Sequence, residues 1–180
     1  MQIFEWEQSV VTVARTWPTN GYLYEFMTFW SDYHKSIWMA VLILLICVFK
    51  FGFRKIAIPV LWATFSVVIA DFVSRRIVKS YIMRPRPNFL DSMCDVSKCW
   101  GFVSSHSANV AAAGAFLILY RRKNAYWVLP IVVLVGFSRV YLIDHFPLDV
   151  IGGYILGLSI GVLIFKCYKK LHYKNKITFL

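Results

Sequence analysis

Long runs of apolar residues, separated by short polar links, dominate the chain from residue 37 onward. A helix that crosses a membrane needs about 20 mostly apolar residues. Five runs approach or reach this length: Ile37 to Phe53, Ile56 to Val73, Val103 to Tyr120, Tyr126 to Leu142 and Leu148 to Phe165. Short links between successive helices are typical of a compact antiparallel bundle. We therefore predict an all-α integral membrane bundle of about five transmembrane helices.

The first 35 residues have a different pattern. Phe4, Val10, Val11, Ala14 and Trp17 recur at helical spacing, with polar residues between them. Such a segment fits an amphipathic helix that lies in the membrane interface. We favour this interpretation over a sixth, weakly apolar span. The chain is then one domain, residues 1–180, with an interfacial segment at 1–35, the bundle at 36–166 and a basic tail at 167–180.

Composition supports a membrane protein. Hydrophobic residues make up 59% of the chain and charged residues 16%, whereas soluble domains are roughly 45–50% apolar. The net charge of +11 suits an anionic lipid, an anionic substrate or nucleic acid. Nucleic-acid binding requires a soluble basic surface, which this pattern disfavours.

The charges also predict an orientation. One face of the bundle carries basic residues without any acid, at positions 50, 54, 55, 121–123, 166, 169, 170, 174 and 176, whereas the other mixes the remaining bases with all 9 acids. Lys and Arg favour the cytoplasmic side, so we place the acid-free face there and the mixed face outside. Cys94 and Cys99 lie in a polar loop of the outer face, where a disulfide and two free thiols are equally open possibilities.

Polar residues that can bind or attack a phosphate gather on the predicted outer face. They are Lys79, Arg86, Ser104, Ser105, His106, Arg139, His145 and Asp149. Arginine forks match phosphate oxygens, lysine adds a compact charge, and the N–H groups at a helix start bind anions. Because His145 and Asp149 are four residues apart, the carboxylate can hold one imidazole nitrogen while the other attacks phosphorus. His106 can protonate the departing oxygen.

Three stretches resemble the signature motifs of the type 2 phosphatidic acid phosphatase family, which also includes the vanadium-dependent haloperoxidases. They are Lys79-x6-Arg86-Pro87, Val103-Ser104-Ser105-His106 and Ser138-Arg139-x5-His145-x3-Asp149. Their order and spacing agree with the family's, and the apolar runs suit its membrane branch rather than its soluble one. The second motif departs from the family's Pro-Ser-Gly-His, because Val103 replaces the proline and Ser105 replaces the glycine.

The resemblance implies a mechanism that uses neither a metal nor another cofactor. His145 is implied to be the nucleophile and to form a phosphohistidine, with Asp149 orienting it. His106 is implied to act first as the general acid and then as the base for water. The residues so implied to bind phosphoryl oxygens, with Ser105 added as a further donor, are Lys79, Arg86, Ser104, Ser105 and Arg139.

These features predict a lipid phosphate phosphatase, an integral protein of the bacterial inner membrane whose site faces the periplasm. Its partner is a membrane lipid and not nucleic acid, and the leading substrates are lipid A 1-phosphate and undecaprenyl diphosphate. Phosphatidylglycerol phosphate and phosphatidic acid are alternatives, as is a lipid-to-lipid phosphotransferase with the same site. The intact His145–Asp149 pair disfavours a non-enzymatic scaffold, and the oligomeric state is left open.

We expect two charged residues and a repeat of small residues to have structural rather than catalytic roles. Asp71 lies one helical turn before Arg75, which favours an ion pair between them. Arg84 lies inside the first motif at a position outside the signature, so we expect it to face solvent or lipid headgroups. Small residues at every fourth position allow membrane helices to approach closely, and they are Gly153, Gly157 and Gly161.

Overall fold

The computed structural model describes residues 4–88, 99–121 and 126–177, which are helical apart from connecting segments and one isolated bridge between Pro85 and Trp100. The elements are α1 (Glu5–Ala14), α2 (Gly21–Ser31), α3 (Tyr33–Phe51), α4 (Phe53–Phe72), the π-helix η1 (Val73–Val78), α5 (Lys79–Ile82), α7 (Ser105–Arg121), α8 (Val128–Tyr141) and α9 (Pro147–Ile177). The all-α prediction is therefore confirmed over the described ranges.

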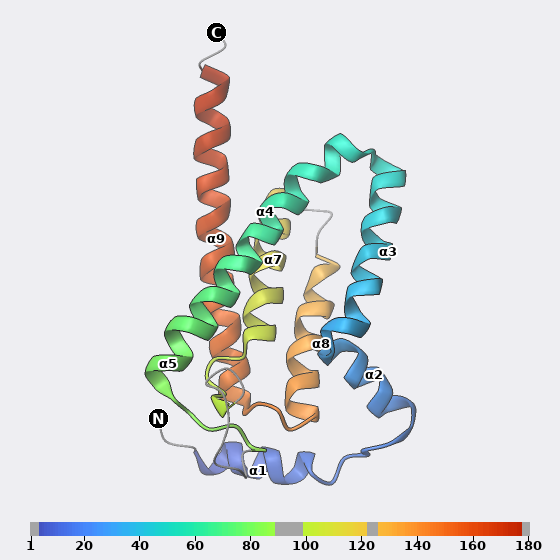
Figure 1. The fold of residues 1–180 in the computed structure, drawn as a ribbon, viewed down its shortest axis with the longest axis vertical. Coiled ribbons are helices and arrows are strands. Elements are labelled where there is room, and N and C mark those ends of the chain that lie inside the picture. The colour runs from blue at the N-terminus through green and yellow to red at the C-terminus, as the bar shows by residue number, and fades with distance from the viewer. Residues whose placement is uncertain (1–3, 89–98, 122–125, 178–180) are drawn as a thin grey trace.

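Five long helices form the body of the described molecule, and each overlaps one predicted apolar run. Figure 1 shows α3, α4, α7, α8 and α9 extending along the long axis, with α1 lying across one end and α9 projecting beyond the other. Two helical stretches are long and apolar enough to cross a membrane, Lys55–Ile82 and Pro147–His172, and Val128–Tyr141 is a shorter apolar helix. The total of five spans stays a prediction.

The contact between α7 and α9 is the most extensive between any two described helices, and the backbones approach closely. A Cβ atom added to Gly153 would lie 2.6 Å from the carbonyl oxygen of Ser104, and Cβ atoms on Gly157 and Gly161 would overlap the carbonyl oxygens of Ala108 and Ala112. The three glycines therefore let two helix backbones touch. The predicted packing role is confirmed, and its consequence is that the first turns of α7 and α9 are held side by side.

The second apolar run continues further than its sequence pattern predicted. The run ends at Val73, where Ser74 introduces a polar stretch, yet the helix continues through η1 and α5 to Ile82. In η1 the Ser74 hydroxyl lies 3.1 Å from the carbonyl oxygen of Asp71, and it points inward. Met83 ends the helix in a left-handed conformation, with φ 48°. Lys79 therefore lies on a helical extension of α4.

The N-terminal segment differs from the single helix that we expected over residues 1–35. It contains two helices, α1 and α2, and α3 begins at Tyr33. The break follows from Pro18, which cannot donate a backbone hydrogen bond, and from Gly21, whose φ is 82°. On α1 the buried residues are Glu7, Val11 and Ala14. The C-terminal end differs also, because α9 continues through the expected tail to Ile177.

Candidate functional site

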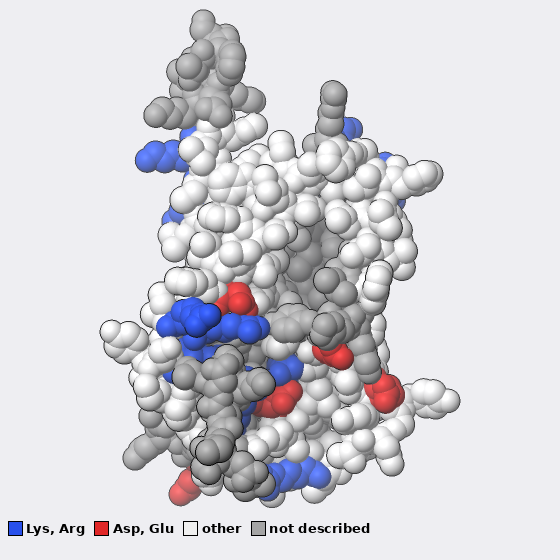
Figure 2. Space-filling view, in the orientation of Figure 1, with Lys and Arg blue, Asp and Glu red and all other residues white. Residues whose placement is uncertain are grey.

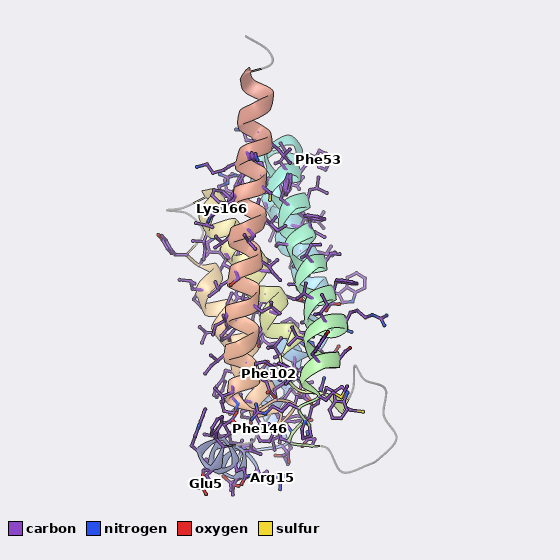
Figure 3. All side chains as sticks on the ribbon, turned by 90° about the vertical axis from the view of Figure 1, so that its left-hand side faces the viewer. Glu5, Arg15, Phe53, Phe102, Phe146 and Lys166 are labelled. Carbon is purple, nitrogen blue, oxygen red and sulfur yellow. The ribbon has the colours of Figure 1, made fainter. Side chains whose placement is uncertain are left out.

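The predicted site residues converge on the end of the bundle that α1 covers. The ends of α5 and α8 and the starts of α7 and α9 all lie at this end of the bundle, as seen in Figure 1. In Figure 3, Phe102 and Phe146 lie just above α1, whereas Phe53 and Lys166 mark the opposite end. Figure 2 shows acidic and basic side chains mixed near this end of the visible face, and a largely uncharged band above them.

His145 and Asp149 form the predicted pair. The imidazole Nδ1 of His145 lies 3.5 Å from Oδ2 of Asp149, and the two side chains are 1% and 0% exposed. The same carboxylate oxygen accepts a hydrogen bond of 3.0 Å from the backbone N–H of Phe146. Asp144, the neighbouring acid, instead pairs with Arg139 at 2.9 Å. Asp149 is therefore the carboxylate that faces His145.

The environment of His145 keeps its imidazole neutral. Burial lowers the pKa of His145 well below its ordinary value of 6.5, and the positive charges of Arg86, Arg139 and Lys79 lower it further. A backbone contact with Gly101 opposes this shift. A neutral imidazole has a free lone pair, which is the form that can attack phosphorus.

Three cations surround this pair. Lys79 and Arg139 are buried, with 2% and 6% of their surfaces exposed, and Arg86 is half-buried. Burial is the main reason that the pKa of Arg86 lies below its ordinary value, and Arg139 contributes. Lysine and arginine this close together repel one another, so an anion bound among them would relieve that repulsion. The arrangement is therefore suited to a phosphate group.

The start of α7 packs against this group through Ser104. Its backbone N–H donates a hydrogen bond of 2.9 Å to the carbonyl oxygen of Asp149, and its hydroxyl lies 3.1 Å from that of Ser107. Ser105 has a different neighbour, since its hydroxyl lies 3.0 Å from that of Ser74 in η1. A phosphate contact by Ser105 stays a prediction. His106, in the first turn of α7, is half-buried.

Arg84 contradicts the expectation that it faces solvent or lipid headgroups. It is fully buried, and its guanidinium bridges two carboxylates that lie far apart in the chain: Nη1 is 2.6 Å from Oδ1 of Asp149, and Nη2 is 2.5 Å from Oε2 of Glu7. The ring of Phe146 covers the guanidinium at 4.8 Å. Glu7 was not among the predicted site residues. The sequence does contain a signal for it, because Glu7, Val11 and Ala14 share one face of α1.

Arg139 receives a second contact that the sequence did not predict. Its Nη1 lies 3.2 Å from the carbonyl oxygen of Ser31 and also donates to the hydroxyl of that residue. Ser31 ends α2, so both N-terminal helices contribute to this end of the bundle. The link joins residues 31 and 139, and such long-range pairs leave no local pattern in a sequence.

The predicted pair of Asp71 and Arg75 is confirmed on the flank of the bundle. Oδ1 of Asp71 lies 2.9 Å from Nε of Arg75 and accepts a hydrogen bond of 3.0 Å from Asn109. These residues border an open cavity of about 580 Å³ beside α4 and η1. Its lining is part apolar and part charged: Val67, Val68, Asp71, Phe72, Arg75, Arg76 and Asn109.

Comparisons with known proteins agree on one family. The PAP2 superfamily model matches residues 57–173. Phosphatidylglycerophosphatase B of Bacillus subtilis is 32% identical over 171 residues, which cover 87% of this chain and 78% of that protein. Lipid A 4'-phosphatase of Porphyromonas gingivalis is 32% identical over 113 residues, or 57% of this chain and 48% of that protein. The chain thus spans about half the length of the latter relative.

A third relative and two solved structures extend the comparison. Undecaprenyl-diphosphatase of Sulfolobus acidocaldarius is 31% identical over 150 residues, covering 76% of this chain and 66% of that protein. The crystal structure of a transmembrane PAP2-type phosphatidylglycerolphosphate phosphatase from Bacillus subtilis matches with a TM-score of 0.64 and 25% identity, covering 91% of this chain and 85% of that one. Aquifex aeolicus LpxE has the same fold, with a TM-score of 0.62 at 21% identity and coverages of 91% and 96%. These homologues indicate a hydrolase that acts on phosphate esters.

Proposed function

Because this chain belongs to the PAP2 superfamily, we propose that it removes phosphate from a membrane lipid through a phosphohistidine on His145. The observation that carries this proposal is the buried pair of His145 and Asp149 among the cations Lys79, Arg86 and Arg139. The pair supplies a neutral nucleophile, and the cations supply charge for the phosphoryl oxygens. Positioning and charge stabilisation account for most of the rate in phosphoryl transfer.

In the first step, Nε2 of His145 attacks phosphorus while the bond to the leaving oxygen breaks. Asp149 faces Nδ1, so it stabilises the positive charge that the imidazole gains as the bond to phosphorus forms. His106 donates a proton to the leaving oxygen of the lipid. The first N–H groups of α7 add donors for the phosphoryl oxygens, since they have no partner within the helix.

In the second step, water replaces the histidine. His106, now neutral, accepts a proton from the attacking water, the new P–O bond forms and the bond between phosphorus and Nε2 breaks. Inorganic phosphate leaves and His145 is again neutral. If a second lipid entered in place of water, the same site would act as a phosphotransferase, and this is the alternative outcome that product identity distinguishes.

For the substrate we propose lipid A 1-phosphate or undecaprenyl diphosphate, with phosphatidylglycerol phosphate and phosphatidic acid as the next candidates. Relatives that act on lipid A, undecaprenyl diphosphate and phosphatidylglycerophosphate support this set. The cavity beside α4 and η1, which adjoins the helix that carries Lys79, offers an apolar side for a lipid tail.

Phosphate release from a panel of these four purified lipids in detergent tests the proposal. We expect release from at least one lipid by the wild-type protein, and a loss of at least about 10³-fold for His145→Ala. His172→Ala is the matched control, because His172 is an exposed histidine on α9. Wild-type protein that releases no phosphate from any lipid, or a His145→Ala variant within tenfold of wild type, would contradict it.

We further propose that the site faces the periplasm of a bacterial inner membrane, with α1 in the interface. Exposed large apolar residues on α1 and directly before it, which include Phe4, Trp6 and Val13, support an interfacial position. Cys99 is disulfide-bonded, and disulfides persist in oxidising compartments; Cys94 lies outside the described residues. A membrane-impermeant thiol reagent, applied to intact cells after mild reduction, should label this loop. Labelling that occurs only after the cells are broken would show that the loop faces the cytoplasm, opposite to the proposed orientation.

A further inference from the structure

Arg84 joins two segments that are remote in the sequence. Its guanidinium contacts Glu7 of α1 at 2.5 Å and Asp149 of α9 at 2.6 Å, and all three side chains are 0% exposed. Removing charges from water is costly, so a buried cluster of this kind persists only where its members are paired. Packed apolar residues could hold α1 against α9 with a smaller desolvation free energy. The use of three buried charges therefore calls for a further reason.

The first reason is the orientation of the Asp149 carboxylate. Oδ1 accepts from Arg84, whereas Oδ2 accepts from the backbone N–H of Phe146 at 3.0 Å and lies 3.5 Å from Nδ1 of His145. Each oxygen of Asp149 therefore accepts its own hydrogen bond, and the carboxylate cannot rotate without losing one of them. Arg84 thus holds the oxygen that faces His145 in place.

The second reason is charge. Asp149 and Arg84 alone would sum to zero, and the imidazole of His145 would face a neutral pair. Glu7 restores one net negative charge to the group, since the three charges together sum to −1. In a buried site such a charge acts strongly on its neighbours. The positive charge that His145 gains while it attacks phosphorus is therefore better stabilised when Glu7 is present.

Glu7 is itself held from three sides. Its Oε2 accepts from Arg84 and from the backbone N–H of Phe4 at 3.3 Å, and its Oε1 accepts from the backbone N–H of Leu148 at 3.2 Å. Leu148 precedes Asp149 in the first turn of α9. Glu7 therefore contacts both the cation that clamps Asp149 and the backbone beside it.

We propose that Glu7 is a positioning residue for the reaction: acting through Arg84, it orients Asp149 and lets that carboxylate stabilise the charge on His145. The inference rests on the proposed function and adds to it a requirement for the N-terminal helix. A purely structural role for Glu7 would affect the amount of folded protein and its stability. A positioning role also lowers the turnover of each folded molecule.

The central variant is Glu7→Gln, which keeps the shape and an oxygen acceptor but removes the charge. Glu5→Gln is the matched control, because Glu5 is an exposed acid on the same helix. With the lipid that the wild type hydrolyses best, we expect kcat of Glu7→Gln to fall about tenfold, with KM changed less than twofold. Glu7→Asp, which keeps the charge, should recover part of the loss, and Glu5→Gln should match wild type.

A kcat of folded Glu7→Gln above one fifth of the wild-type value would overturn the proposal, and so would a loss in KM alone. If Glu7→Gln does not fold, the paired variant Glu7→Met/Arg84→Met removes both buried charges together. The net charge of the group stays at −1, so this variant tests the orientation of Asp149 through Arg84, and a kcat above one fifth of the wild-type value would overturn the proposal.

If the wild-type protein is inactive on every lipid, the proposed function is wrong. The positioning role of Glu7 is then tested by the binding of orthovanadate. Vanadate can occupy a phosphate site as a five-coordinate mimic held by a histidine. Calorimetry should give at least fivefold weaker vanadate binding to Glu7→Gln than to wild type. Equal affinities, or no vanadate binding to either protein, would overturn the proposal.

Discussion

Arg75 and Arg84 each pair with an aspartate, one on the flank of the bundle and one inside its end. The side chains of Arg75 and Asp71 are 39% and 35% exposed and lie one turn apart on one helix. Those of Arg84 and Asp149 are 0% exposed and come from different helices. A partly exposed pair contributes little, because each charge can be solvated alone. A buried pair is costly to form and more costly to break, because the remaining charge has no substitute for water.

The largest expected effect is therefore the loss of Arg84. Arg84→Met leaves Glu7 and Asp149 as buried carboxylates without their shared partner, and we expect the free energy of unfolding to fall by about 3–5 kcal/mol. Arg75→Met should cost about 1 kcal/mol or less. Thermal or denaturant unfolding of the two purified variants in the same detergent measures both. Equal losses of unfolding free energy in the two variants would contradict the difference between a buried and an exposed ion pair, on which the functional interpretation of Arg84 depends.

The same contrast predicts which sequence features could be interpreted without a structure. The pair of Asp71 and Arg75 follows from the spacing of two residues, and the glycine contact of α9 follows from a repeat of four. The phosphate-binding residues follow from motif order. Each of these patterns lies within a short stretch of sequence, or is a series of such stretches in a fixed order.

Arg84 was misassigned because its partners lie at residues 7 and 149, and no spacing rule connects such positions. Its position beside the signature residues suggested solvent, since an unpaired arginine is rarely buried. Glu7 could have been suspected from its place on the face that contains Val11 and Ala14. The continuation of the second helix through η1 depends on tertiary contacts, which override local preference.

Two glycines allow a similar comparison with smaller effects. One faces a backbone carbonyl, which cannot move easily, and the other faces side chains, which can. A Cβ atom on Gly157 would overlap the backbone carbonyl of Ala108, whereas one on Gly114 would meet only methyl groups of Val128 and Val132 at 3.1 Å. Gly157→Ala should therefore cost about 1–3 kcal/mol by overpacking, and Gly114→Ala less than half as much. Unfolding midpoints of the two variants check this. A larger loss for Gly114→Ala would refute the close contact between α7 and α9.

Burial of His145 should make the stability of the protein depend on pH. The pKa of His145 lies well below 6.5 in the folded protein, so below that pH the unfolded chain takes up a proton that the folded chain does not. The free energy of unfolding should then fall as the pH falls below about 6.5, by up to about 1.4 kcal/mol per pH unit. His145→Asn should flatten this dependence. Identical slopes for the variant and the wild type would contradict the assigned environment of His145.

The smallest effect concerns a buried pair without charge. The Ser105 and Ser74 hydroxyls lie 3.0 Å apart, so Ser105→Ala should cost about 1 kcal/mol of stability. Loss of the predicted phosphate contact should also raise KM with little change in kcat. Ser74→Ala should cost a similar amount, and the double variant less than the sum of the two. Unfolding and steady-state kinetics of the three variants measure this. An unchanged KM would contradict the phosphate contact, and an unchanged stability would contradict the contact with Ser74.

The central claim is that His145 carries the phosphoryl group during turnover without a metal. The most direct measurement is rapid quenching of the enzyme with a lipid substrate that carries a radiolabelled phosphate, in the presence of EDTA. We expect label on the protein that is stable to base and labile to acid, as a phosphohistidine is, located at His145 and absent from His145→Ala. Label on another residue, or labelling and turnover that appear only when a divalent metal is restored, would contradict the account.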